Sequence, residues 1–167
     1  QSGLLPGLSR PERFNVEATL GLNDSGKFMS KWVYLKNVSS ASSGKHSPWT
    51  RGLPDILPLP IAHAEGKFMV QGPDVLEAMK KNSQVVFRYC DDSGREAGFP
   101  WNPNGSLDNI AGVSDPSGRI LGLMPHPERH VSYLQHPNWR RPEYRAEANS
   151  AGLLIFKSGV DFAKRSL

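Results

Sequence analysis

Alternating apolar and polar positions predict strands over several short segments of the chain. Residues 26–38, GKFMSKWVYLKNV, alternate in this way and are rich in aromatic and β-branched side chains. Residues 56–66 are extended because their prolines exclude a helix, and residues 84–90, QVVFRYC, predict a further strand. The segments 110–115 and 119–125 flank a Pro-Ser-Gly turn, which predicts a hairpin.

Helical spacing is confined to two segments. Residues 72–82, GPDVLEAMKKN, predict a short helix with a proline and an acidic residue in its first turn and lysines in its last. Residues from about 149 to 165 predict an amphipathic closing helix, because four apolar residues recur at spacings of three and four. They are Leu153, Phe156, Val160 and Ala163. The first dozen residues predict the end of a helix or a turn, closing at Pro6-Gly7, and residues 39–54 predict a loop rich in Ser, Gly and Pro.

The length of 167 residues suits a single domain, residues 1–167, with a core of its own. Strands with few helices between them are unusual for a complete α/β protein, so we expect part of the sheet to lie outside this chain. No apolar run approaches the length of a membrane span, and the N-terminal stretch has neither a secretory pattern nor an initiator Met. The single cysteine, Cys90, excludes an internal disulfide and favours a cytoplasmic location.

A net charge of +4 raises the question of nucleic-acid binding. The Lys and Arg residues are scattered, apart from NWRRPEYR at 138–145, whereas nucleic-acid footprints gather their charge on one face or arm. We therefore expect a generally basic surface and no nucleic-acid partner. The more remote alternative is a nucleic-acid-binding module that uses Trp139, Arg140, Arg141 and Arg145. The five histidines share no ligand spacing and there is no CxxC, so we expect no metal site.

The sequence ILGLMPHPERH, residues 120–130, places His126 and Glu128 just after a predicted strand. Side chains two apart in an extended segment point the same way, and Pro127 disfavours a helix at His126. A carboxylate beside an imidazole holds one tautomer, which is the base-and-orienter half of a Ser- or Cys-type triad. The alternative is a surface His-Glu pair of little consequence. The spacing does not decide between the two, because His63 and Glu65 form a second such pair.

The wider context does distinguish them. The segments ILGLMPHPER, NPNGSLDNIAG, PIAHAEGKF, NDSGKFMSKWV and SGLLPG closely resemble the glutaminase component of phosphoribosylformylglycinamidine synthase, a class I glutamine amidotransferase of purine biosynthesis. The resemblance runs from residue 1 to about 130 and resumes at the closing helix, AGLLIFKSGVDFA. It implies a flavodoxin-like α/β fold and a Cys-His-Glu triad that releases ammonia from glutamine. By position, His126 becomes the general base and acid, and Glu128 orients it.

The resemblance leaves the nucleophile outside the given sequence. In the family, the catalytic cysteine lies on a strand-to-helix turn shortly before the stretch that begins here at Ser2, together with the first strands of the sheet. We therefore expect an incomplete flavodoxin-like sheet that lacks its N-terminal strands and nucleophile elbow, and a chain that does not hydrolyse glutamine alone. Cys90 is not expected to substitute, because Asp91 and Asp92 raise the pKa of its thiol.

Further residues have both a functional and a structural interpretation. Ser25, Gly26 and Phe28 resemble the family segment beside bound glutamine, although Asp-Ser-Gly also makes a tight turn unaided. We assign His63 and Glu65 to support of the site or of a partner contact. A structural Asx turn is the more favoured role for a third group, which consists of Asn102, Asn104 and Gly105. Residues 131–148 match the family least and are either a partner-docking loop or an exposed insertion.

The resemblance also implies partners. Glutamine is the expected substrate, and a synthetase subunit or domain would use ATP and magnesium to convert formylglycinamide ribonucleotide to its amidine. The given chain has no Gly-rich phosphate-binding motif, so we expect no cofactor in it. The alternative to an enzyme is a non-catalytic amidotransferase-like scaffold or regulatory subunit that lacks the nucleophile.

Overall fold

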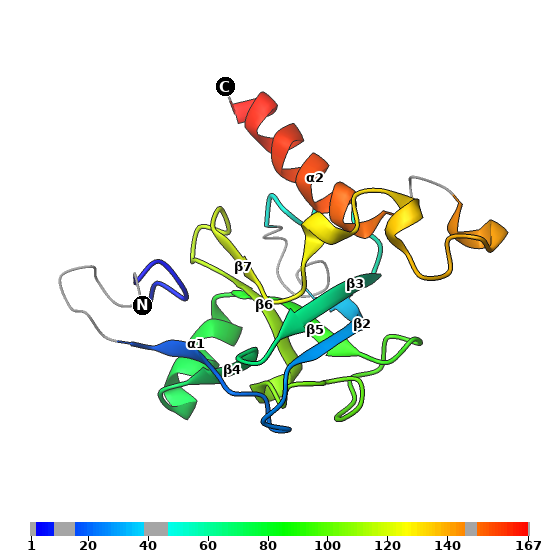
Figure 1. Ribbon diagram of the computed structural model, residues 1–167. Helices are drawn as coiled ribbons and strands as arrows, with labels where there is room; N and C mark the ends of the chain where they lie inside the picture. Colours follow the sequence, from blue (N-terminus) through cyan, green and yellow to red (C-terminus); the bar gives the residue numbers. More distant parts are fainter. Residues whose placement is uncertain (1–2, 9–15, 39–46, 146–149, 167) are drawn as a thin grey trace.

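The computed structural model describes residues 3–8, 16–38, 47–145 and 150–166. Within them the strands are β1 (Ala18–Gly21), β2 (Met29–Asn37), β3 (Ile56–His63), β4 (Lys67–Val70), β5 (Val85–Cys90), β6 (Ile110–Ser114) and β7 (Leu121–Leu123). The α-helices are α1 (Pro73–Lys81) and α2 (Ala151–Ser166). Four single 3-10 turns complete the order: η1 (Leu107–Asn109), η2 (Pro127–Arg129), η3 (Tyr133–Gln135) and η4 (Pro142–Tyr144). The described part of the chain is therefore mixed α and β (Figure 1).

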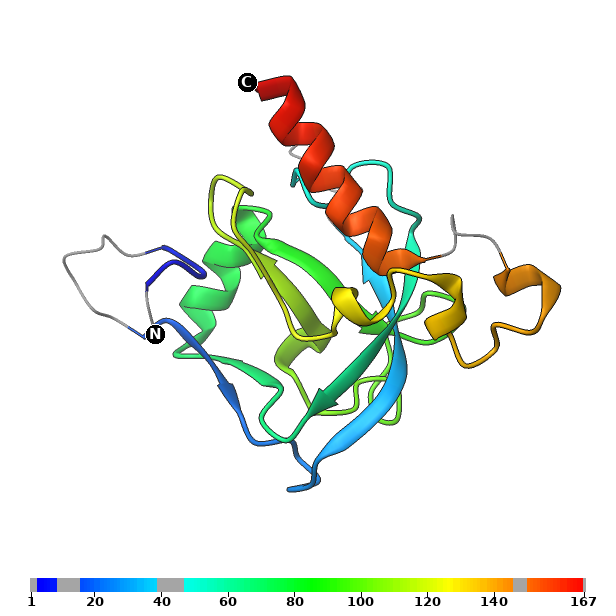
Figure 2. The same cartoon turned by 45° about the horizontal axis from the view of Figure 1, so that its top comes forward.

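A five-stranded antiparallel sheet in the order β3-β2-β5-β6-β7 forms the centre of the fold. A second, two-stranded antiparallel sheet pairs β1 with β4. The large sheet curls, because the chain that leaves β7 at one edge returns to β3 at the other, where the His126 N–H donates to the Pro60 carbonyl at 2.8 Å. Figure 2 shows β3 and the chain after β7 close together. The curl brings residue 126 beside the end of β3.

The core lies inside this curl and follows the alternation of the strands. Every second residue of β3 is buried, while five of the six β5 residues are buried and Arg88 is half-buried. The main cluster joins these strands to β2, β6 and the start of α2 through Val33, Leu35, Leu57, Leu59, Ile61, Val86, Phe87, Tyr89, Ala111, Ala151 and Ile155. A second cluster packs α1 and β4 against β5 and β6 and consists of Phe68, Met79, Val85, Ile110 and Val113.

Most predicted elements are confirmed. The predicted strands within 26–38, 56–66 and 84–90 are β2, β3 and β5, and the predicted hairpin is β6-β7, whose turn is closed by the Asp115 carboxylate. The helix predicted over 72–82 is α1, with Pro73 in its first turn and Met79 buried. Residues 48–52 of the predicted loop form turns, whereas 39–46 lie outside the described residues.

Three features of the fold differ from the expectations. The β1-β4 pair was not predicted, because neither four-residue strand is long enough to alternate clearly. Residues 3–8 form bends, which excludes the helix end but not the turn that the sequence also allowed, and residues 1–2 and 9–12 lie outside the described residues. The predicted apolar face of the closing helix is largely exposed, with Phe156 40% and Val160 52% exposed.

Apart from Ile155, the buried face of α2 instead carries small residues, which let the helix approach the sheet and loops closely. Ala151, Gly152, Ile155 and Ser158 are buried. A Cβ at Gly152 would collide with the Pro127 carbonyl, and one at Gly159 would meet the Trp49 ring. Figure 1 shows the C-terminal half of α2 extending beyond the sheet. None of the helices within the described ranges is long and apolar enough to cross a membrane.

Candidate active site

His126 and Glu128 lie on the chain that leaves β7, and they form a direct hydrogen bond. The His126 Nδ1–H donates to Glu128 Oε1 at 2.6 Å. His126 precedes η2, and its backbone N–H is fixed to Pro60 of β3. The expectation that an extended segment brings the pair together is wrong. His126 itself is extended, but Pro127–Arg129 form a single 3-10 turn, so the carboxylate reaches the ring from a turn and not from an extended segment.

The electrostatics of the pair favour an ionised carboxylate. Burial acts to raise the pKa of Glu128, but its own backbone N–H, the His126 ring and Arg129 outweigh burial, so the pKa lies below its ordinary value. The Glu128 side chain is 56% exposed and that of His126 is 29% exposed. The carboxylate holds the proton on Nδ1 and leaves Nε2 as the basic nitrogen. The structure thus brings together the two residues that the sequence singled out as base and orienter.

The three residues considered for substrate binding share one short loop before β2. Ser25, Gly26 and Phe28 are exposed, Phe28 to 65%. Gly26 has a φ of +62°, which closes the turn, and its N–H donates to the Asn23 carbonyl at 2.8 Å. The loop leads into Met29, which pairs with His63 at the end of β3. The structure therefore places the loop next to His63.

His63 does not pair with Glu65, contrary to their grouping in the sequence. The His63 side chain is buried and Nδ1 lies 3.0 Å from Asn23 Oδ1, whereas Glu65 is exposed. Burial and the nearby His126 ring lower the pKa of His63, so the ring is held in its neutral form. His63 and His126 therefore lie close enough to influence one another. Sequence spacing missed this relation because His126 approaches β3 only through the curl of the sheet.

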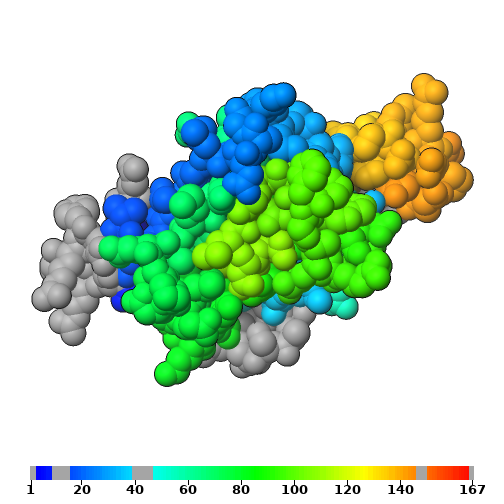
Figure 3. Space-filling view, turned by 90° about the horizontal axis from the view of Figure 1, so that it is seen from below, coloured from blue at the N-terminus to red at the C-terminus, as the bar shows by residue number. Residues whose placement is uncertain are grey.

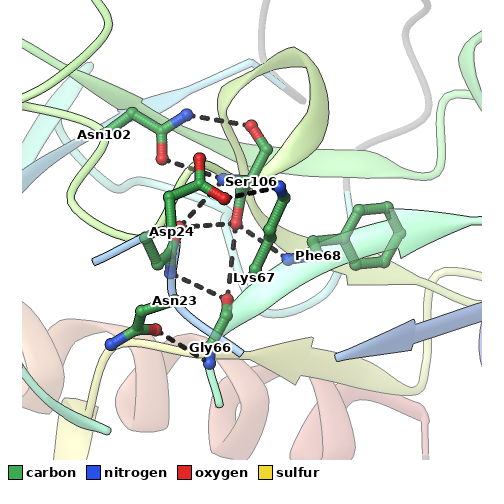
Figure 4. A network of polar contacts seen from close by, with 8 residues as sticks. Asn23, Asp24, Gly66, Lys67, Phe68, Asn102 and Ser106 are labelled. Atoms are coloured by element: carbon green, nitrogen blue, oxygen red, sulfur yellow. Dashed lines mark hydrogen bonds and ion pairs between the residues drawn. The ribbon is translucent and has the colours of Figure 1, made fainter. Parts of the chain in front are cut away.

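The turn at residues 102–106 makes a network of polar contacts with Asp24 and with residues 66–68. Asn102 and Asn104 are buried, and Asn104 Nδ2 donates to the Gly66 carbonyl at 2.7 Å. Ser106 Oγ accepts from the Phe68 N–H at 2.9 Å, and Lys67 bonds to Asp24 at 2.6 Å. Figure 4 shows Gly66, Lys67 and Phe68 meeting Ser106 and Asp24. The Asx turn predicted here is present, since Asn102 Oδ1 and Asn104 Oδ1 both accept from the Ser106 N–H.

Cys90 lies at the end of β5 with its side chain fully buried. Burial, with Asp91 as the next contribution, raises the pKa of its thiol to about 11. A thiol that is buried and protonated at neutral pH is a poor nucleophile. Its expected structural role agrees with this environment.

The segment after η2 folds back on the sheet through aromatic rings. The Trp32 ring on β2 packs edge-on against His130 and His136, at 4.9 Å and 4.6 Å between ring centroids. His136 stacks on Tyr144 at 4.2 Å. Beyond this anchor, Arg140 lies 5.2 Å from the Trp139 ring. Figure 3 shows the segment, in orange, projecting from one side of the surface.

No group of three or more His, Cys, Asp or Glu suited to a metal ion occurs in the described part of the chain. An apolar cleft of about 470 Å³ lies between residues 5–6, β1, β4 and the β6-β7 hairpin. Its lining runs up to Met124, two residues before His126.

Residues 1–163 match the CobB/CobQ-like glutamine amidotransferase domain family, and the chain belongs to this family. The resemblance inferred from the sequence motifs is thereby confirmed.

Individual relatives narrow the match. The chain is 40% identical over 165 residues to the phosphoribosylformylglycinamidine synthase subunit PurQ of Dehalococcoides mccartyi, a match that covers 99% of this chain and 59% of the relative. It is 36% identical over 168 residues to the same subunit of Methanococcus maripaludis, covering 95% and 58%. A solved structure of PurLQS from Thermotoga maritima matches with a TM-score of 0.57 and 29% identity, over 88% of this chain and 53% of that one. The chain thus spans less than two-thirds of the length of these two curated relatives.

Proposed function

We propose that this chain is part of the glutaminase of a phosphoribosylformylglycinamidine synthase, which releases ammonia from glutamine for the ATP-dependent amidination of formylglycinamide ribonucleotide in purine biosynthesis. The observation that carries the proposal is the 2.6 Å His126–Glu128 hydrogen bond in a chain of the glutamine amidotransferase family. The names of the relatives support the choice of this enzyme among amidotransferases.

In the proposed reaction His126 acts as both base and acid. Its free Nε2 takes the proton of a cysteine thiol, and the thiolate attacks the side-chain amide carbon of glutamine. The C–N bond breaks as His126 returns the proton to the leaving nitrogen, which departs as ammonia. His126 Nε2 then deprotonates a water molecule, which attacks the thioester. Glutamate is released, and the leaving thiolate takes the proton back from His126. Glu128 stabilises the imidazolium that forms in each half of the reaction.

We place the nucleophile on a cysteine outside this sequence. Cys90 is fully buried and the pKa of its thiol is raised to about 11, so it is unsuited to the attack. The complete protein would carry this cysteine on the further strands of a flavodoxin-like sheet. We place those strands against the exposed Phe156 and Val160 face of α2, since an apolar face left in water is costly. This chain alone is accordingly proposed to be inactive.

In the proposed enzyme, two components bind different substrates. ATP, magnesium and the ribonucleotide would bind to a synthetase partner, and glutamine to this component through the loop of Ser25, Gly26 and Phe28. The name of the similar structure, PurLQS of Thermotoga maritima, supports such a partner. We place the enzyme in the cytoplasm, where a free thiol such as Cys90 stays reduced.

Glutamine hydrolysis by the native full-length protein with its synthetase partner tests the proposal. We expect His126→Ala to lower kcat at least about 100-fold, because it removes general acid–base catalysis. Glu128→Gln should lower kcat about tenfold to a hundredfold, because the amide cannot stabilise the imidazolium.

The matched control for this test is Glu77→Gln. It changes an exposed carboxylate on α1, remote from η2, and should leave kcat unchanged. Full activity of His126→Ala would contradict the proposal. A wild-type protein without glutaminase activity would favour the scaffold alternative.

A further inference from the structure

The loop before β2 makes few contacts of its own. Its residues 24–28 are all exposed, and its internal hydrogen bonds are the Gly26 turn and a weak exchange between Ser25 Oγ and Lys27. A loop that must form one wall of a substrate pocket needs an external anchor to hold its shape. Asp24 is held by Lys67 and by the Asn104 carbonyl, and the buried anchor is Asn23, which is only 2% exposed at the base of the loop.

All four hydrogen-bonding positions of the Asn23 side chain are used. Its Nδ2 donates to the carbonyls of Lys27 at 2.8 Å and His63 at 2.9 Å. Because both of these partners are acceptors, the orientation of the amide is fixed, and Oδ1 must face the donors. Those donors are the Gly66 N–H at 3.2 Å and His63 Nδ1 at 3.0 Å. The proton of the His63 ring therefore lies on Nδ1.

The other nitrogen of the ring has the complementary role. Nε2 of His63 faces Asn104 Nδ2 at 3.5 Å, and Asn104 Oδ1 is already occupied by the N–H and hydroxyl of Ser106. Asn104 Nδ2 also donates to the Gly66 carbonyl at 2.7 Å and to the Tyr89 hydroxyl at 3.2 Å, so its contact with Nε2 is the longest of the three. A donor group facing Nε2 is compatible with a neutral ring whose Nε2 is unprotonated. The lowered pKa of His63 agrees with this state.

Two glycines leave space for this arrangement. A Cβ at Gly66 would collide with the His63 ring, and one at Gly105 would collide with the Asp24 carboxylate. The Asp24 N–H donates to the Asn104 carbonyl at 3.2 Å. The segments 23–28, 63–66 and 102–106, which are far apart in the sequence, therefore interlock around one imidazole.

We propose that His63 is a positioning residue, whose neutral ring clamps Asn23 and thereby holds the 24–28 loop in the shape that receives glutamine beside His126. This inference rests on the proposed glutaminase function. His63 itself touches neither substrate nor the reacting atoms. Its loss should weaken glutamine binding while the His126–Glu128 pair, which makes its own hydrogen bond, keeps its chemistry. The expected signature is a raised KM with little change in kcat.

Three variants of the native full-length enzyme test the proposal by steady-state glutaminase kinetics. His63→Leu removes both ring nitrogens and should raise KM for glutamine about tenfold, in line with the loss of a buried hydrogen bond, while kcat changes less than about threefold. His63→Asn places an amide N–H near the Nδ1 position and should restore most of the affinity. Gly66→Ala keeps the histidine but displaces its ring, and should resemble His63→Leu.

Ser158→Ala is the matched control for a general loss of stability. It removes a buried hydroxyl that bonds to the Pro48 and Arg51 carbonyls, outside the network, and should leave KM unchanged. A KM for His63→Leu equal to that of the wild type, or a loss confined to kcat, would overturn the proposal. So would a His63→Asn variant as impaired as His63→Leu.

Amide hydrogen exchange separates this inference from the proposed function. The amides of Asp24 and Gly26 are hydrogen-bonded within the network and should lose protection at least about tenfold in His63→Leu but not in His63→Asn. If the wild type shows no glutaminase activity and the exchange result is still as expected, the proposed function is wrong, but His63 still holds the 24–28 loop through Asn23. Unchanged protection in His63→Leu would refute the clamp whatever the activity.

Discussion

His126 and His63 show how one residue type takes two roles in neighbouring environments. His126 is partly exposed and bonded to a carboxylate, which suits a group that gains and loses protons. His63 is buried and bonded only to neutral amides, which suits a fixed neutral ring. The difference arises from the partners and not from sequence spacing, since both residues have a glutamate two positions later.

Three buried histidines should make the stability of the protein depend on pH. Burial lowers the pKa of His63, His130 and His136 below the ordinary value of 6.5. The folded state therefore binds fewer protons than the unfolded state below that value, so the free energy of unfolding falls as the pH drops from about 7 to about 5. Carboxylates with a lowered pKa, such as Asp91, lower the free energy of unfolding further only at more acidic pH, where they become protonated.

Urea unfolding across this range measures the effect. His136→Phe retains a ring that can stack on Tyr144 but has no titrating nitrogen, so its free energy of unfolding should depend less steeply on pH than that of the wild type. An identical slope in the two proteins would contradict the assignment.

At the scale of elements, α2 and η2 depend on one another. The N–H groups of Gly152 and Leu153 both donate to the His130 carbonyl, and the absence of a side chain at Gly152 admits the Pro127 carbonyl. The start of α2 thus supports the turn that carries Glu128.

Gly152→Ala should destabilise the protein by about 1–3 kcal/mol, because its methyl group forces α2 and η2 apart. The matched control is Gly98→Ala, whose methyl group meets nothing within 4 Å. Its effect should stay within about 0.5 kcal/mol. Thermal or urea unfolding measures both, and equal stability of the two variants would show that the contact between α2 and η2 is not tight.

At the scale of the whole molecule, the sequence predicted the individual strands and helices better than the way they pack together. Strands such as β2 and β5 were predictable because alternation and β-branched residues are local signals. The exposed face of α2 was misassigned because helical spacing identifies an apolar stripe but not what covers it. The interaction of His63 with Asn23 depends on strand pairing and the curl of the sheet, which no local pattern specifies.

The site was predictable to a similar extent. His126 and Glu128 were found because two residues separated by one proline form a short motif, and the resemblance to a family singled out this pair. The 3-10 turn that joins them was not predicted, since Pro127 is compatible with an extended chain as well as with the first residue of a turn. The network around His63 spans about 80 residues of sequence and required the fold.

The most direct test of the central claim is the intact mass of the native full-length protein after reaction with a glutamine-mimicking chloroketone, followed by mapping of the modified peptide. The account predicts a single adduct, on a cysteine other than Cys90, that is protected by glutamine. An adduct on Cys90, or none at all, would contradict the assignment of His126 and Glu128 to a working glutaminase.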